Sequence, residues 1–293
     1  TGCLGCIGMG QAPAAGRNSL RTFPRNFPGR SGTADDSVWL CSPETAAAAA
    51  LTGRITDPRE LPDLLGIPWP RLELPATSSA EAAPLEAPLP PGRARQVELE
   101  RAPSIGSLPD LDPLPDSIEA PVAVKVGDDV STDEIVPAGA RALPYRSNIE
   151  KLAEFAFSGV DPDYLERARR AGPHAIVGGR NYGQGSSREH AAIAPRYLGL
   201  RLVLARSYAR IHWQNLANFG VLPLELADES DYDTVEVGDR LGAEHLHDQL
   251  RRGDRVVLRD LDRDTVIRAR HRLSPRQVAM ILAGGRIPQF RQG

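Results

Sequence analysis

One segment of the sequence, residues 178–190, combines four glycines with a run of polar and charged side chains. It follows a predicted strand and is expected to open a helix, whose unpaired N-terminal amides would favour an anion. Ser186 and Glu189 stand three residues apart, a spacing that is also typical of a capping box. Capping accounts for these two residues but leaves the glycines and Arg188 unexplained. The pattern therefore favours an anion or oxyanion site, with helix capping as the alternative.

Two cysteines near the start of the chain, Cys3 and Cys6, are separated by two residues and surrounded by glycines. In a protein that is not secreted, this spacing indicates redox chemistry or a metal. The glycines would let the backbone approach a bulky cluster, but a complete cluster cage usually needs at least three thiolates. Cys41 is the third cysteine, and its apolar surroundings predict a small core residue. The spacing alone leaves metal binding open.

Other charged residues also have types and spacings that could do chemistry. Arg25 and Arg30 lie in a turn with proline and glycine, where two guanidinium groups could hold a carboxylate or phosphate. Surface solvation is the commoner fate of a single arginine. Asp133 and Glu134 follow Ser-Thr and precede Arg146, and these two carboxylates could equally form a solvated turn.

The elements that would carry these residues begin with an α/β region at residues 1–75. A strand is expected at residues 38–41. Ser42 and Pro43 then mark the start of an alanine-rich helix that Gly53 ends.

The rest of the chain is predicted to be a linker and a second α/β domain. Prolines are frequent from Pro75 to Pro121 and no hydrophobic period persists, so we expect a linker at residues 76–120 and a domain at residues 121–293. The predicted strands of that domain are 122–126, 174–177, 202–205 and 221–226, with a hairpin of 255–258 and 265–270. The predicted helices are 187–198, 209–219 and one that starts at Ser274-Pro275. Alternating strands and helices indicate a sheet with parallel strands and antiparallel additions.

The composition excludes several classes of protein. Hydrophobic residues make up 41% and charged residues 25% of the 293 residues, which excludes wholesale disorder. A formal net charge of −3 argues against a dedicated nucleic-acid binder. No apolar run approaches the length of a membrane span. The chain starts with Thr1 and has no signal-peptide pattern, so we expect a piece of a longer protein.

Four blocks of the sequence resemble the aconitase superfamily, in that family's order, and the resemblance extends over essentially the whole chain. The blocks are Cys3-Leu4-Gly5-Cys6-Ile7-Gly8, Arg25-Asn26-Phe27-Pro28-Gly29-Arg30, Ser131-Thr132-Asp133, and Gly183-Gln184-Gly185-Ser186-Ser187-Arg188-Glu189-His190 with Tyr208-Ala209-Arg210-Ile211-His212 downstream. Bacterial aconitate hydratases are the most similar group. The resemblance implies the C-terminal end of an aconitase-type α/β domain, a linker, and an α/β swivel domain with a mixed sheet.

The resemblance also implies a reaction and the residues that perform it. The chain would belong to a hydro-lyase that interconverts citrate and isocitrate through cis-aconitate. Cys3 and Cys6 would be two thiolate ligands of a [4Fe–4S] cluster, with the third ligand elsewhere. Ser186 would be the general base, its alkoxide stabilised by Arg188 and by amides at a helix start. Asp133 would support the histidine that protonates the leaving hydroxyl. The substrate carboxylates would be held by Arg25, Arg30, Arg146, Ser187 and Arg188.

Two positions depart from the family pattern. Pro24 replaces an asparagine before the first loop arginine, and Glu134 replaces a histidine after Asp133. The first departure removes one expected contact, and the second weakens the acid–base assignment around Asp133. His174, His190 and His212 are expected to be structural.

Alternative functions stay open at this stage. An isopropylmalate or homoaconitate hydro-lyase of the same superfamily is the first, although Arg146 favours a substrate with three carboxylates. RNA binding by the cluster-free form is the second. We further expect a cytoplasmic protein that has no membrane partner and is a monomer at full length.

Overall fold

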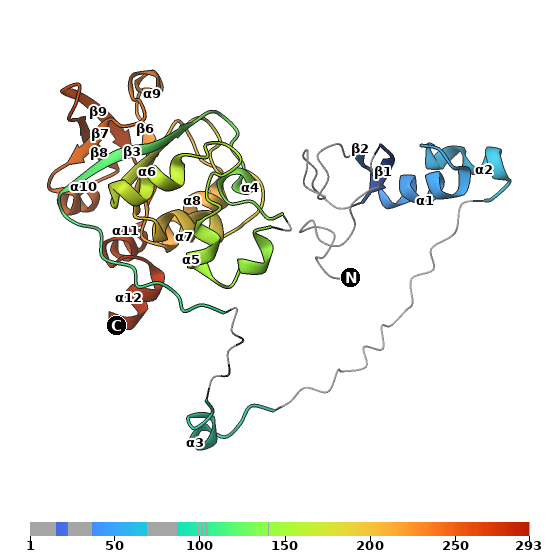
Figure 1. Cartoon of the computed structure of the whole chain (residues 1–293), viewed down its shortest axis with the longest axis horizontal. Coiled ribbons are helices and arrows are strands. Elements are labelled where there is room, and N and C mark those ends of the chain that lie inside the picture. The colour runs from blue at the N-terminus through green and yellow to red at the C-terminus, as the bar shows by residue number, and fades with distance from the viewer. Residues whose placement is uncertain are drawn as a thin grey trace. The chain divides into compact units, whose positions relative to one another are not determined.

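The computed structural model describes residues 16–22, 37–68, 87–98, 100, 102, 105–139 and 141–292. The chain divides into two compact units, residues 1–102 and residues 103–293. The elements of each unit are labelled in Figure 1.

The described part of the first unit is a pair of short strands followed by small helices. These elements are β1 (Asn18–Arg21), β2 (Ser37–Leu40), α1 (Pro43–Thr52), η1 (Pro58–Glu60), α2 (Leu61–Leu65) and α3 (Pro91–Ala94). β1 and β2 pair in parallel. α1 begins after Ser42, whose side chain accepts a hydrogen bond from the Thr45 amide, and it ends at Gly53 with φ 74°. The predicted strand and helix are therefore both present.

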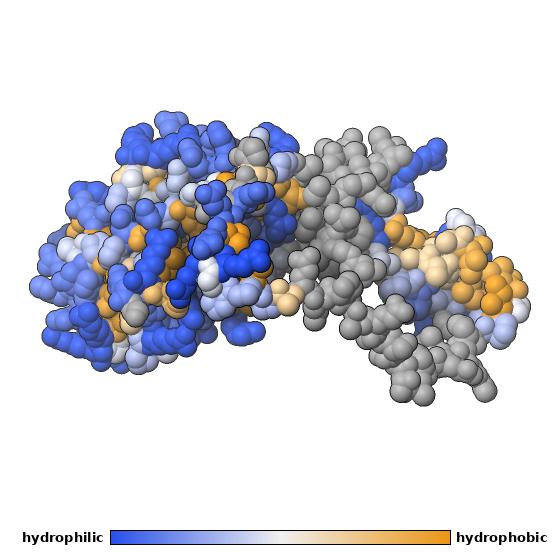
Figure 2. All heavy atoms as spheres, turned by 90° about the horizontal axis from the view of Figure 1, so that it is seen from below, coloured by the Kyte–Doolittle hydropathy of each residue, from blue (hydrophilic) through white to orange (hydrophobic). Residues whose placement is uncertain are grey.

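This unit buries little of its own apolar surface. Among its described residues only Arg21, Ala48 and Thr56 are buried. Nine large hydrophobic side chains are exposed: Trp39, Leu40, Leu51, Ile55, Leu64, Leu65, Ile67, Leu89 and Val97. Figure 2 shows orange, hydrophobic atoms gathered over this part of the surface. Parallel strands are normally buried on both faces, so the two strands among the described residues form only part of a layer.

The second unit is built on seven strands that close into a barrel. These are β3 (Ile118–Val126), β4 (His174–Gly178), β5 (Leu200–Ala205), β6 (Leu222–Leu226), β7 (Arg240–Ala243), β8 (Arg255–Asp260) and β9 (Thr265–Arg270). Their order is β3-β4-β5-β6-β9-β8-β7. The pairs from β3 to β6 are parallel, and the remaining pairs are antiparallel. The predicted mixed sheet is confirmed. Its closure into a barrel was not predicted.

Helices cover the parallel half of the barrel. The helices of this unit are α4 (Thr132–Ile135), η2 (Leu143–Tyr145), α5 (Ile149–Ala153), α6 (Tyr164–Ala171), α7 (His190–Tyr197), α8 (Arg210–Asn218), α9 (Asp231–Thr234), α10 (Leu246–Arg252), α11 (Pro275–Leu282) and α12 (Arg286–Gln292). α5, α6, α7 and α8 lie together against the parallel strands (Figure 1). Each parallel crossover needs such a connection to return the chain to the same edge of the sheet.

The alternation of strand side chains divides the core in two. Leu202 and Leu204 of β5 belong to a cluster that draws on all seven strands and so fills the barrel. Val203 and Ala205 of the same strand belong to a cluster shared with α5, α6, α7 and α8. Because successive strand residues point to opposite faces, both faces of β5 are apolar and buried.

Part of the proline-rich segment packs against the second unit. Leu114 is 1% exposed and lies in the barrel cluster. The Arg196 guanidinium, 4% exposed, donates to the Asp112 carbonyl at 2.8 Å and to the Phe219 carbonyl at 3.2 Å. β3 also begins at Ile118, before the alternation that predicted a strand at residues 122–126. The compact unit therefore includes residues that composition alone marks as linker.

Candidate functional site

Three loops meet where the parallel strands β3, β4 and β5 end. The first covers residues 127–131, the second is residues 179–189, here called the glycine loop, and the third covers residues 206–209. Backbone bonds join them: the Tyr182 amide donates to Ser207 O at 3.0 Å, and the Thr132 amide donates to Gln184 O at 2.9 Å. Ligands of parallel α/β sheets bind at this edge, so the fold puts the glycine loop at a suitable place for a site.

The conformation of the glycine loop depends on its glycines. Gly183 and Gly185 have φ values of 76° and 96°, which disfavour any side chain. A Cβ on Gly183 would also lie 2.1 Å from the His212 ring. His212 is 1% exposed and packs against Tyr182, with ring centroids 5.3 Å apart. The loop backbone therefore rests directly on the His212 ring.

Ser186 and Ser187 lie before the helix, and not at its start. α7 begins at His190, and its N-cap Glu189 makes no side-chain cap hydrogen bond. The capping alternative is therefore wrong, and so is the expectation of helix-start amides beside Ser186. The Ser186 carbonyl instead accepts from the Thr132 hydroxyl at 3.0 Å and from the Arg188 amide at 2.8 Å. These bonds keep the chain out of a helix until residue 190.

Asp133 and Arg188 form an ion pair across two loops. Asp133 lies in α4, with 7% of its side chain exposed, and Arg188 has 15% of its side chain exposed. The Arg188 guanidinium donates to Asp133 Oδ1. The positive charge of Arg188 next to Ser186 is thus partly offset by a carboxylate.

Glu134 has a local structural role. Its carboxylate accepts from the Ser131 amide at 2.7 Å, and the Ser131 side chain accepts from the Glu134 amide at 3.2 Å. This reciprocal capping box starts α4. The departure from the family pattern at residue 134 therefore stabilises the short helix that carries Asp133.

Arg146 comes close to the glycine loop through its backbone. The His190 Nε2 atom lies 2.8 Å from the Arg146 carbonyl oxygen. The Arg146 side chain is exposed, and no hydrogen bond or ion pair of its guanidinium is found within the described part of the chain. The structure thus brings together Asp133, Ser186, Ser187 and Arg188, and it places the Arg146 backbone beside the first residue of α7.

The remaining predicted site residues lie outside the described residues. Cys3, Cys6, Arg25 and Arg30 are all in this group. The one described cysteine, Cys41, is a free thiol and only partly buried, so the expected core position is wrong. A cluster cage needs at least three thiolates. The described residues therefore do not form one.

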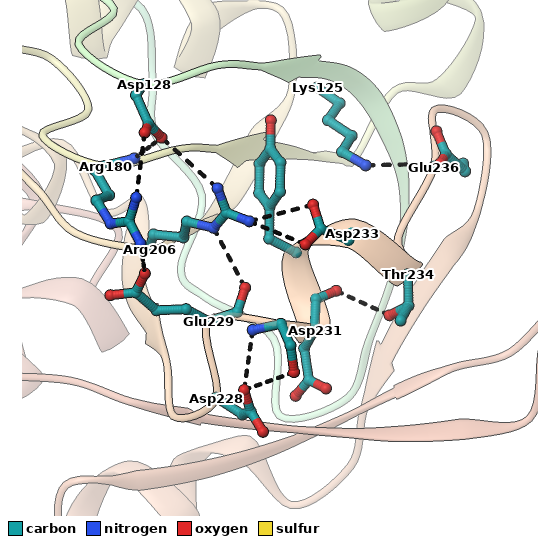
Figure 3. Close-up of polar contacts among 12 residues, drawn as sticks. Lys125, Asp128, Arg180, Arg206, Asp228, Glu229, Asp231, Asp233, Thr234 and Glu236 are labelled. Atoms are coloured by element: carbon teal, nitrogen blue, oxygen red, sulfur yellow. Dashed lines mark hydrogen bonds and ion pairs between the residues drawn. The ribbon is translucent and has the colours of Figure 1, made fainter.

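A network of charged residues anchors the start of the glycine loop (Figure 3). Arg180 Nη2 lies 2.5 Å from Glu229 Oε2, and the Arg180 amide donates to Asp128 Oδ1 at 2.6 Å. The Arg206 guanidinium lies 4.1 Å from the centre of the Tyr232 ring. These contacts join the glycine loop to the segment after β6 and hold its first residues in place.

An acidic cluster elsewhere in the barrel is paired with arginines. Asp239, Asp260 and Asp262 are close enough to share a cation. However, Arg263 Nε lies 2.9 Å from Asp239 Oδ2 and 3.6 Å from Asp260 Oδ2, and Arg240 pairs with Asp262. The two arginines thus offset part of the negative charge of the cluster.

Two buried histidines are uncharged because of their surroundings. Burial lowers the pKa of His212 to about 3 and that of His174 to about 4. His174 Nε2 lies 2.9 Å from the Tyr164 hydroxyl, whereas neither ring nitrogen of His212 has a hydrogen-bond partner among the described residues. The prediction that both are structural agrees with their burial.

Thr132 and Gln184 join the loop of α4 to the glycine loop, and neither was predicted as a site residue. Thr132 stands inside the Ser-Thr-Asp block, so its position next to Asp133 was the available signal. Gln184 stands between the two glycines with positive φ. The bonds from Thr132 to Gln184 and to Ser186 span 52 and 54 positions, so they have no local sequence signature.

Comparison with known proteins gives a family for both ends of the chain. Residues 158–229 match the family described as Aconitase C-terminal domain, and residues 1–53 match the Aconitase family (aconitate hydratase). The first match includes β4, the glycine loop, α7, β5, α8 and β6. Ser186, α7 and α8 thus lie within the matched region.

Individual relatives agree with this result. "Putative aconitate hydratase, mitochondrial" of Emericella nidulans is 31% identical over 96% of this chain and 41% of its own length. "Homocitrate dehydratase, mitochondrial" of Saccharomyces cerevisiae is 29% identical over 97% of this chain and 42% of its own length. A solved 3-isopropylmalate dehydratase structure from Methanocaldococcus jannaschii has a TM-score of 0.50 and 27% identity, covering 60% of this chain and 94% of that one.

A closed mixed sheet with a glycine loop at the ends of its parallel strands, matched in this way, is an aconitase-type swivel fold. The chain belongs to the aconitase family and matches the C-terminal portion of its members. It spans about two fifths of the length of the curated relatives named above. Those relatives are fungal, so the expected likeness to bacterial aconitate hydratase stays a prediction. Within the described residues, no helix is long and apolar enough to cross a membrane.

Proposed function

We propose that this chain supplies the general base and several carboxylate-binding residues of a hydro-lyase that interconverts citrate and isocitrate through cis-aconitate. The observation that carries the proposal is the position of Ser186. It lies in a glycine loop at the carboxyl ends of parallel strands, beside the Asp133–Arg188 ion pair. Family resemblance and geometry thus point to the same loop.

Ser186 acts as the base that removes the proton next to a substrate carboxylate. Its hydroxyl is only partly buried, and it has no hydrogen-bond partner among the described residues, so it can receive a substrate. A serine hydroxyl is a poor base, and its alkoxide needs positive charge nearby. Arg188 supplies that charge, and a bound substrate carboxylate would share the guanidinium with Asp133.

The substrate carboxylates are bound by arginines and by a serine. Arg146 has an exposed guanidinium, and its backbone contacts the first residue of α7. Ser187, the residue that follows the proposed base, is exposed. We assign the other two carboxylate contacts to Arg25 and Arg30, as the family resemblance implies. Asp133 would then hold the histidine that protonates the leaving hydroxyl.

Cys3 and Cys6 are proposed as two of the three thiolate ligands of a [4Fe–4S] cluster. When bound, the cluster supplies a Lewis acid for the substrate hydroxyl. The third thiolate has to come from further aconitase-family sequence. We call a protein that joins such sequence to this chain the complete enzyme.

We also propose a domain organisation with residues 1–75 as the end of the iron–sulfur α/β domain, residues 76–120 as the linker and residues 121–293 as the swivel domain. The last part of this linker, from Asp112 on, packs with the swivel domain and supplies the start of β3. The exposed apolar side chains of the first unit support this division, since they belong against the rest of such a domain. Cytoplasmic location and a monomeric complete enzyme remain predictions.

Two other substrates in the same superfamily are candidates. The yeast relative is named for homocitrate, and the solved structure for 3-isopropylmalate. An isopropyl group needs an apolar wall where a third carboxylate needs a cation. The exposed guanidinium of Arg146 favours the tricarboxylate. RNA binding by the cluster-free form has no specific support among the described residues.

The test compares the chain alone with the complete enzyme after anaerobic reconstitution with iron and sulfide. Dehydration of citrate, homocitrate and 3-isopropylmalate is measured for both. We expect turnover by the complete enzyme only, with the highest kcat/KM for citrate. Strong turnover by the chain alone would refute the need for further sequence. Preference for 3-isopropylmalate would refute the assigned substrate.

A further inference from the structure

The carbonyl of Ser186 is held by two donors from different parts of the chain. One is the Thr132 hydroxyl, whose Oγ1 lies 3.0 Å from Ser186 O. The other is the Arg188 amide, at 2.8 Å. A carbonyl oxygen has two lone pairs, so both are used and the peptide plane after Ser186 is fixed. The Ser186 Cα lies in that plane, so the point from which the side chain projects is constrained.

Thr132 is itself tightly held. It is 0% exposed and is the first residue of α4. Its amide donates to Gln184 O at 2.9 Å, and its carbonyl accepts from the Val136 amide at 3.1 Å. Ser131 also forms a parallel bridge with Gln184. The hydroxyl therefore approaches Ser186 from an element that has little freedom to move.

We propose that Thr132 is a positioning residue, whose hydroxyl fixes the backbone of Ser186 so that the side chain points at the substrate. The proposal rests on the proposed function of Ser186. Thr132 makes no contact with substrate in this account and acts only through the Ser186 carbonyl. Without the hydroxyl, the carbonyl keeps only the Arg188 amide, which belongs to the same loop and moves with it.

A purely structural role for Thr132 makes a different prediction. The residue is buried at the start of a helix, where its methyl group and its shape contribute to packing. Thr132→Val keeps the shape and the methyl group but removes the donor. Thr132→Ser keeps the donor but removes the methyl group. The pair therefore separates hydrogen bonding from packing.

The first measurement is steady-state kinetics of both variants in the complete enzyme. We expect Thr132→Val to lower kcat about 10- to 100-fold with little change in KM, since a misplaced catalytic group can cost about 10² in rate. Thr132→Ser should keep kcat within about threefold of the parent, although the lost methyl group lowers its melting temperature. Equal losses of kcat in both variants, or losses that follow the melting temperature, would overturn the proposal.

The second measurement needs no activity and uses the chain as it is. Hydrogen exchange is followed at the amides of residues 186–188. Exchange at Arg188 should be faster in Thr132→Val and unchanged in Thr132→Ser. Unchanged exchange in both variants would refute the positioning role. If Ser186→Ala leaves kcat intact while this exchange pattern holds, the proposed base is wrong and the Thr132 contact still stands.

Discussion

At the scale of single residues, the site is made by contacts between loops that are far apart in the sequence. Asp133 and Arg188 pair across 55 positions, and the Thr132 hydroxyl reaches the Ser186 carbonyl across 54. Removing one member of a buried ion pair leaves an uncompensated charge, so each member depends on the other. Residue types and motif order predicted the members of this site, whereas the pairings required the fold.

The substrate role of Arg146 is tested by Arg146→Leu in the complete enzyme. Loss of a charge-assisted partner of a desolvated carboxylate typically costs about 2–5 kcal/mol, so kcat/KM for citrate should fall at least about 30-fold. The side chain is exposed, so the melting temperature should stay within about 1 °C of the parent value, because surface changes are usually small.

Steady-state kinetics and a thermal melt on the same preparation provide both values. Arg141→Leu is a suitable control, because Arg141 is also exposed and stands in the same segment. Citrate kinetics unaffected by Arg146→Leu would place this residue outside the site and favour the isopropylmalate alternative.

At the scale of elements, the glycine loop and α8 form one packed assembly. The Gly183 backbone rests on His212 of α8, and Gly179 packs equally closely on residues 127–128. Sequence periodicity predicted β4, β5, β6 and α8 to within a few residues, because each is a continuous apolar element with clear ends. The predicted start of α7 at Ser187 was wrong. The helix begins at His190, since the Thr132 hydroxyl binds the Ser186 carbonyl and holds residues 186–188 outside the helix.

Gly183→Ala tests this packing. The new methyl group would lie 2.1 Å from the His212 ring, at a φ of 76° that disfavours a side chain. We expect a loss of about 2–4 kcal/mol in the free energy of unfolding. Urea unfolding measures it, with Gly159→Ala as the control, because a Cβ there meets nothing within 4 Å. Equal stability of the two variants would contradict the close packing described here.

The low pKa of the buried His212 side chain makes the stability of the chain depend on pH. Burial lowers its pKa to about 3, so between about pH 3 and 6.5 the unfolded state binds more protons than the folded state. The free energy of unfolding therefore falls as the pH decreases through that window. The contribution of this group between pH 7 and pH 5 is about 2 kcal/mol.

The corresponding experiment compares the parent chain with His212→Leu, which has a similar volume and cannot titrate. Urea unfolding at pH 7 and pH 5 gives the change in unfolding free energy for each protein. The loss on acidification should be smaller in His212→Leu by about 2 kcal/mol. The same loss in both proteins would mean that His212 is charged or accessible in the folded state.

At the scale of the whole molecule, the two units differ in what they bury. The barrel unit has a continuous core inside the sheet and another beneath its helices. The described part of the first unit buries three residues and exposes nine large apolar side chains. Composition predicted two α/β regions around a proline-rich segment, but barrel closure depends on β7, a short strand with no distinctive pattern. Closure was therefore beyond sequence reasoning.

This difference predicts how fragments of the chain behave. A fragment of residues 103–293 should unfold cooperatively at a temperature close to that of the parent chain, because its core is complete. The similar archaeal structure supports this expectation, since the match covers 94% of that separate chain. A fragment of residues 1–102 should show no cooperative transition. Circular dichroism melts of both fragments measure this, and an unfolded 103–293 fragment would contradict it.

The central claim is that Ser186 is the general base, and Ser186→Ala in the complete enzyme tests it most directly. The measurement is kcat for citrate, alongside cluster absorbance, citrate affinity and a melt, with Ser158→Ala as a surface control. The account predicts that kcat falls by about 10²–10⁴. Cluster content and citrate affinity should be kept, and the melting temperature should hardly change because Ser186 caps no helix. A kcat within twofold of the parent value, with the cluster intact, would contradict it.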